Sequence, residues 1–133
     1  MSGPRLRLRV VSPERVLVET DAEVVSLPGA LGELGVLPGH AALITALRTG
    51  VLGFLSHGTA RRVAVFGGFA EVREDEVTVL ADGAALAEEI DRAAALAELA
   101  AAREALAGAA AEAAPIVRAR LEAAEARLAA TSS

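Results

Sequence analysis

Residues able to carry chemistry are few in this 133-residue sequence, and they lie far apart. The absence of Cys excludes a thiolate nucleophile, a disulfide and a cysteine-ligated zinc, and the absence of Lys excludes a P-loop. His40 and His57 have no second His at metal-ligand spacing, so we interpret them as turn or capping residues. The serines and threonines include no G-x-S-x-G elbow. The sequence therefore predicts no metal site and no catalytic site of its own.

Two further patterns have structural explanations. Gly29, Gly32 and Gly35 are spaced as G-x-x-G-x-x-G, which is neither the dinucleotide fingerprint nor a Walker loop and instead predicts turns. The acidic residues at 71 and 74–76 cluster near the expected end of a strand. Solvated charges at a hairpin explain that cluster better than a pair of catalytic carboxylates does.

Charge and hydropathy narrow the classes of partner. Eighteen acidic residues against thirteen Arg give a net charge of −5, which argues against a nucleic-acid partner. The longest run without Arg, Asp or Glu covers residues 34–47, which is shorter than the roughly 20 residues that span a bilayer. The first residues alternate Arg with apolar types and lack the apolar core of a signal peptide. We therefore expect no transmembrane segment and no leader.

A period of two runs from residue 5 to residue 80, broken by turn residues every eight to twelve positions. In residues 5–10, Arg alternates with Leu or Val, which places the charges on one face of a strand. Turns are expected at the pairs 28–29, 38–39, 57–58 and 67–68, each of which contains Gly. This pattern is typical of a small antiparallel β-sandwich. Its other strands are expected at residues 16–18, 24–27, 51–55, 62–66, 69–72 and 77–80.

The composition changes abruptly after Gly83. From Ala84 to Ala130, 23 of 47 residues are Ala, which predicts helix over the whole stretch, with Leu86 and Ile90 on the apolar stripe of the first helix. Gly108 and Pro115 bracket the break between two helices. The sequence thus predicts a two-part α+β fold. An antiparallel β-sandwich occupies residues 1–83 and an antiparallel helical hairpin occupies residues 84–133.

Residues 32–41 differ from the other turn regions. The segment GELGVLPGHA has two tight turns and apolar side chains beside a single Glu, in what the pattern predicts to be a surface loop. Such a loop is either a docking surface or a cover over the core, and physical reasoning alone leaves these two interpretations equal.

Five motifs follow one another between residues 10 and 82. They are VVSPE (10–14), GELGVLPGHA (32–41), LITAL (43–47), GGFAEV (67–72) and VTVLAD (77–82). In their order they resemble the epsilon subunits of bacterial F-type rotary ATP synthases, and the resemblance runs from Leu8 to about Ala130. It implies a ten-stranded β-sandwich followed by two helices, in a non-catalytic subunit of the central stalk.

The resemblance also implies protein partners. In that family the sandwich binds the gamma subunit and rests on the ring of c subunits, coupling ring rotation to gamma during proton-driven ATP synthesis. The family's ring-facing loop matches Glu33, Leu34, Gly35, Val36, Leu37, Pro38, Gly39 and His40. An exposed ion pair from Glu33 to a basic c-subunit loop contributes only ~0–1 kcal/mol, so shape and apolar contact are expected to dominate. The implied location is the cytoplasmic face of the bacterial plasma membrane, as a peripheral subunit.

The hairpin is the regulatory part of that family. It inhibits ATP hydrolysis by extending along gamma into the catalytic alpha/beta hexamer, and about 47 helical residues reach roughly 70 Å. The candidate contacts are Arg103, Arg118, Arg120 and Arg127, although a solvated helix face remains the alternative interpretation for most of them.

Nucleotide sensing by the hairpin is the alternative function. Some family members bind ATP through an Ile-Asp-x-x-Arg-Ala pattern. Ile90 and Asp91 match that pattern, but Ala94 occupies the Arg position, and Arg92 lies about 200° around the helix from it. Only Arg118 and Arg120 of the second helix then remain as sources of phosphate contacts. No cofactor and no metal are expected.

Overall fold

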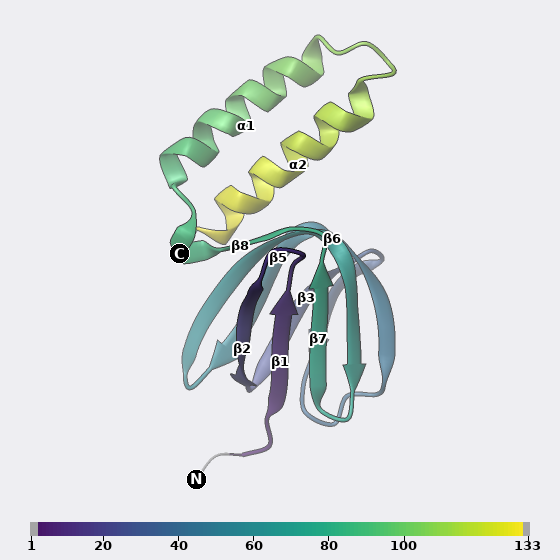
Figure 1. Cartoon of the computed structure of the whole chain (residues 1–133), viewed down its shortest axis with the longest axis vertical. Coiled ribbons are helices and arrows are strands. Elements are labelled where there is room, and N and C mark those ends of the chain that lie inside the picture. The colour runs from purple at the N-terminus through teal and green to yellow at the C-terminus, as the bar shows by residue number, and fades with distance from the viewer. Residues whose placement is uncertain (1–2, 132–133) are drawn as a thin grey trace.

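Eight strands come first along the chain and two helices come last. The computed structural model describes residues 3–131, and Figure 1 shows the helices projecting from one end of a β-sandwich, with the N-terminus at the other end. The strands are β1 (Leu6–Val11), β2 (Val16–Ala22), β3 (Val24–Gly29), β4 (Gly32–Val36), β5 (Leu43–Ser56), β6 (Thr59–Arg73), β7 (Glu76–Ala81) and β8 (Ala84–Leu86). The 3₁₀ segment η1 (Ala87–Glu89) leads into α1 (Arg92–Ala107) and α2 (Ala114–Ala130). The predicted two-part α+β fold is confirmed.

The strands form one curled sheet. Its order is β2-β1-β7-β6-β5-β3-β4, with β8 also paired to β6. Every pair is antiparallel except β1 with β7, which is parallel. The predicted alternation in β1 is confirmed, because Leu6, Leu8 and Val10 are buried while the intervening Arg side chains face solvent. The buried Leu and Val side chains of seven strands meet in one core between the layers.

The predicted turn at Gly67-Gly68 is wrong, because β6 continues through both residues. Gly67 and Gly68 have φ of 83° and 124°, conformations that other residues rarely adopt, and they bend the strand without ending it. The first half of β6 pairs with β8 and the second half with β7. The structure has eight strands where the resemblance implied ten, because β5 and β6 are single strands of 14 and 15 residues.

The predicted loop at residues 32–41 is partly a strand. β4 pairs with β3 at the edge of the sheet, where Val36 is fully buried and Leu34 packs against the core. Only residues 37–42 lie outside regular structure. The segment therefore covers the core through Leu34 and Val36, and it exposes Glu33 and Leu37 to solvent.

Helix begins eight residues later than the Ala-rich composition predicted. Residues 84–86 pair with β6 instead, and Leu86 packs against the sandwich core. The Asp91 side chain then caps α1 by accepting a 3.1 Å hydrogen bond from the Ala94 amide. The expected break is confirmed, since Gly108 caps α1 and Pro115 lies in the first turn of α2.

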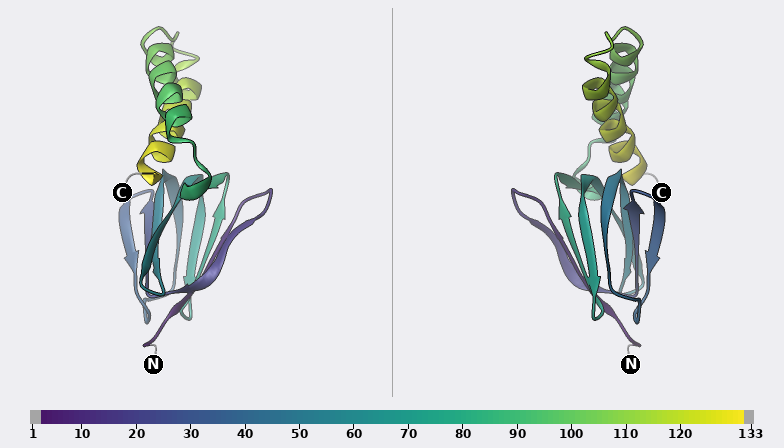
Figure 2. Two further views of the ribbon diagram at one scale, coloured as in Figure 1. Left: turned by 90° about the vertical axis from the view of Figure 1, so that its left-hand side faces the viewer. Right: turned by 90° about the vertical axis from the view of Figure 1, so that its right-hand side faces the viewer.

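Small side chains hold the hairpin to the sandwich. Ala126 and Ala130 near the end of α2 pack on Ala64 of β6, in a cluster apart from the main core. The Arg127 guanidinium lies 4.5 Å from the centre of the Phe66 ring, a cation–π contact. Figure 2 shows that the rest of the hairpin projects beyond the sheet. Because burying a methyl group stabilises by only about 0.8 kcal/mol, this docking is weak compared with the sandwich core.

Candidate functional site

Large apolar side chains lie across the outer face of the sheet. Cross-strand pairing aligns Ala46, Phe69, Leu80, Val11 and Val16 on five successive strands, over about 19 Å at the usual strand spacing. Phe69 and Leu80 are 50% and 58% exposed, and neighbouring Ile44 is 73% exposed. We call these six residues the apolar row. An exposed apolar surface that continues over five strands marks a docking surface.

Charges of β1 and β2 on the same face pair with one another. Beside the apolar row, Arg9 of β1 lies 3.3 Å from Glu19 of β2, and Arg7 lies 3.3 Å from Asp21. These cross-strand pairs satisfy each other within the sheet. The apolar row is therefore the part of this face whose burial under a partner releases the most free energy.

Two adjoining hollows follow the row. One, of about 300 Å³, is lined by Ile44, Phe69, Ala70, Glu71, Thr78 and Leu80. The other, of about 580 Å³, shares Phe69 and Leu80 and is also lined by Asp82. Each hollow is thus mostly apolar and is lined by one carboxylate. Such a surface is suited to apolar side chains of a partner.

The residues predicted to face the c-ring lie along β4 and the irregular segment that follows it. Glu33 is exposed beside the β3–β4 turn, where it pairs with Pro28, and Leu31 at that turn is fully exposed. Gly39 lies at the other end, where its amide donates a 2.7 Å hydrogen bond to Asp75 in the β6–β7 turn. The His40 Nδ1 contacts the Ala41 carbonyl oxygen at 2.6 Å. The structure therefore does not bring Glu33 and His40 together.

A pocket of about 470 Å³ lies where the hairpin meets the sandwich. It is lined by Ala85, Glu89, Ile90, Asp91, Ala94, Ala95, Glu98 and Arg127. Of the predicted nucleotide contacts, only Ile90 and Asp91 belong to it. Three carboxylates and one guanidinium line the pocket, and two of the carboxylates, Glu89 and Glu98, are ion-paired with Arg15 and Arg120. The pocket therefore presents few groups that bind a phosphate.

The four Arg residues predicted as inhibitory contacts divide into two groups. Arg120 forms an ion pair with Glu98 of α1, and its hydrogen bond lowers the pKa of the Glu98 carboxyl. Arg127 lies over Phe66. Arg103 and Arg118 are exposed on the helix surfaces. Two of the four predicted inhibitory contacts are thus engaged within the chain when the hairpin is docked.

Within residues 3–131 there is no group of three or more His, Asp or Glu side chains placed to hold a metal ion. No helix in that part of the chain is long and apolar enough to cross a membrane.

Comparison with known proteins identifies the family. The sequence pattern of the ATP synthase delta/epsilon chain β-sandwich domain matches residues 5–87, which include every strand. The chain belongs to the ATP synthase delta/epsilon family. A similar family member is the ATP synthase epsilon chain of Pelotomaculum thermopropionicum, 48% identical over 95 residues that cover 71% of each chain. The epsilon chain of Solibacter usitatus is also 48% identical, over 126 residues and 93% of each chain.

Two solved ATP synthases contain chains of the same fold as this delta/epsilon family member. One is in the mitochondrial ATP synthase of Euglena gracilis, with a TM-score of 0.85, 24% identity, and coverage of 98% of this chain and 83% of that one. The other is in the central stalk and c-ring of the Tetrahymena thermophila mitochondrial enzyme, with a TM-score of 0.64, 12% identity, and coverage of 99% and 100%. The predicted family resemblance is confirmed, and so is its fold.

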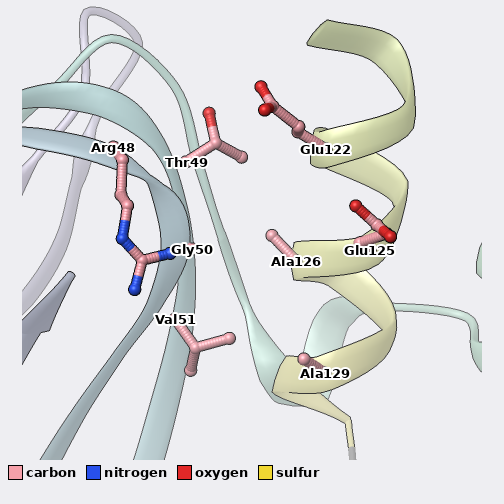
Figure 3. A pocket seen from close by; sticks show the side chains of 8 residues that line it. All are labelled: Arg48, Thr49, Gly50, Val51, Glu122, Glu125, Ala126 and Ala129. Carbon is pink, nitrogen blue, oxygen red and sulfur yellow. The ribbon is translucent and has the colours of Figure 1, made fainter. Parts of the chain in front are cut away.

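A cleft separates much of α2 from the sheet in this delta/epsilon chain. Its volume is about 390 Å³, and it is lined by Arg48, Thr49, Gly50 and Val51 of β5 and by Glu122, Glu125, Ala126 and Ala129 of α2. Figure 3 shows the Arg48 guanidinium lying along the strand, directed away from the carboxylates of Glu122 and Glu125. The helix therefore touches the sheet mainly through its final turns.

Sequence analysis missed the apolar row of this delta/epsilon chain. The sequence does contain a pattern that indicates it. Ile44, Phe69 and Leu80 are large apolar residues at outward positions of the two-residue alternation, where polar side chains are usual. Only the strand register shows that these positions are neighbours. Residues from β5, β6 and β7 then form one surface.

Proposed function

We propose that this chain is the non-catalytic epsilon subunit of a proton-translocating F-type ATP synthase, and that its apolar row binds the gamma subunit in the central stalk. The observation that carries the proposal is a wide exposed apolar surface beside the paired charges of β1 and β2. A rigid two-layer sandwich bound in this way passes torque between the c-ring and gamma without doing chemistry. The corresponding location is peripheral, at the cytoplasmic face of the bacterial plasma membrane.

The edge of the sandwich at β4 is the proposed c-ring contact. Of the segment from Glu33 to His40, Glu33 and Leu37 present exposed side chains, whereas the Val36 side chain is buried in the core. The fully exposed Leu31 extends this edge at the β3–β4 turn. A contact of this kind combines apolar side chains with one carboxylate, which fits a partner loop that carries basic residues.

The hairpin is the proposed inhibitor of ATP hydrolysis. Its attachment through Ala126, Ala130 and Arg127 is small enough for a partner to compete with it. Arg103 and Arg118 are available in the docked state, whereas release of the hairpin also frees Arg127 from Phe66. The alternative, an ATP-sensing hairpin, gains no support from the pocket at Ile90 and Asp91, whose lining includes a single guanidinium.

Deleting residues 91–133 is expected to raise ATP hydrolysis several-fold in a reconstituted complex of alpha, beta, gamma and this chain. The physical reason is that the sandwich keeps its gamma-binding face but loses the helices that reach the catalytic hexamer. Co-elution in size-exclusion chromatography and ATPase activity are measured in the same fractions. Circular dichroism of the shortened chain checks that the sandwich has folded.

Unchanged hydrolysis together with full co-elution would remove inhibition from the proposal and leave mechanical coupling. Failure of the full-length chain to co-elute would overturn the stalk assignment itself. The two results are distinguishable because binding is measured before activity.

A further inference from the structure

Two consecutive glutamates on η1 are each bound by an Arg from a different part of the sandwich. Glu88 pairs with Arg61 of β6 at 2.7 Å. Glu89 pairs with Arg15 in the turn between β1 and β2, 74 residues earlier in the chain. Since η1 is the segment that joins sandwich and hairpin, both ion pairs act on the hinge. Figure 2 shows the β1–β2 turn reaching the end of the sandwich where this hinge lies.

The contact between Arg15 and Glu89 is a two-pronged one. Arg15 Nη1 donates to Glu89 Oε2 at 3.1 Å, and Nη2 donates to Glu89 Oε1. A guanidinium fork on a carboxylate is the strong and directional form of an ion pair, and it fixes the orientation of both groups. The hydrogen bond from Arg15 lowers the pKa of the Glu89 carboxyl, in agreement with this geometry.

Besides the two ion pairs and the pairing of β8 with β6, only small contacts orient the hinge. The segment itself contributes Ala87 and Ile90 to the small cluster around Ala64, and the hairpin beyond it docks through alanines and one cation–π contact. Because the hairpin is held this weakly to the sandwich, a directional bond at the hinge decides how often the hairpin is docked. The β1–β2 turn is well suited to provide that bond, because β1 is paired on both sides within the sheet.

We propose that Arg15 and Glu89 form a latch that holds the hinge and thereby sets the fraction of chains in which the hairpin is docked. Arg15 acts as a positioning residue, since it acts through Glu89 and touches no part of the hairpin helices. Arg15 is also the residue immediately before Val16 of the apolar row. It is a property of the chain alone and does not require the proposed gamma partner.

The docked fraction of the full-length chain tests the latch. The sequence has no Cys, so Thr59→Cys and Ala119→Cys place spin labels on the exposed first residue of β6 and on the exposed face of α2. Electron–electron distance measurements then give the docked and released populations. We expect R15A and E89Q each to raise the released fraction several-fold, and the double variant to raise it no further than either single change.

R7A is the matched control. Arg7 is exposed to a similar degree as Arg15 and also forms an ion pair, with Asp21, but that pair lies within the sheet, away from the hinge. R7A is expected to leave the populations unchanged. The charge swap R15E/E89R is expected to restore the wild-type docked fraction, which separates a latch from a general loss of stability.

Three results would overturn the latch. In the first, R15A matches R7A and the wild type. In the second, the double variant releases the hairpin further than either single variant, which shows that the two residues act independently. In the third, the charge swap releases the hairpin as much as R15A does while circular dichroism shows a folded chain.

Discussion

Phe69→Glu is expected to weaken binding of this chain to a gamma-containing catalytic complex by at least about 100-fold, because two penalties of a few kcal/mol combine. The variant loses the burial of the aromatic ring of the apolar row. It also places a new carboxylate between Glu71 and Asp82, where a partner would bury it close to two like charges. Titration calorimetry with the purified complex measures the dissociation constant.

The fold is expected to survive this change, since the Phe69 side chain is half exposed and lies outside the core. Leu96→Glu is the matched control. Leu96 is 47% exposed, but it lies on α1, away from the sheet face. The control is expected to bind as the wild type does, with an unchanged melting temperature for both variants. Equal binding by the wild type, Phe69→Glu and Leu96→Glu would show that the apolar row is not the gamma-binding surface.

Local patterns predicted most of the sandwich because alternating burial is a local property. The strands around Val10, Val63 and Val79 follow directly from their two-residue period. Strand order and register are long-range properties, so the alternation left open which outward positions are neighbours. The apolar row emerges only when β1, β7, β6 and β5 lie side by side.

Two errors at Gly68 and Ala84 share one physical cause. A Gly-Gly pair usually ends a strand and Ala-Ala-Leu usually forms helix, yet both lie within the sheet here. The Phe66 amide donates to the Gly83 carbonyl and the Asp82 amide donates to the Gly67 carbonyl, so β7 and β8 follow β6 through its bend. Backbone pairing between distant segments outweighs local propensity at both places.

No sequence pattern predicted the contacts that join the sandwich to the hinge and the hairpin. Arg15 with Glu89 and Arg127 with Phe66 join residues far apart in the chain, and no spacing relates them. The Arg candidates of the hairpin were predicted by family resemblance. The structure adds which of them are engaged in the docked state. A switch of this kind depends on such long-range contacts, so its control can be inferred only once both parts are seen together.

Gly68→Ala is expected to cost about 3 kcal/mol or more of folding stability, because backbone strain and a clash act together. Gly68 has φ of 124°, and a Cβ there would lie 2.2 Å from the Leu80 carbonyl oxygen and 2.8 Å from the Ala81 Cα. Neither atom can move without shifting β7. Thermal unfolding followed by circular dichroism is expected to show a melting temperature lower by on the order of 10 °C.

Two other glycines separate strain from clash. Gly58 has φ of 77° but open space around it, so Gly58→Ala tests strain alone, whereas Gly35→Ala has open space and no positive φ. The expected order of destabilisation is Gly68→Ala, then Gly58→Ala, then Gly35→Ala. If Gly68→Ala were no worse than Gly58→Ala, the close approach of β7 would not be what requires Gly68. Gly68 lies against the backbone of Leu80, which belongs to the apolar row. The expected order of destabilisation would therefore also mean that the bend in β6 fixes the position of the proposed gamma-binding surface.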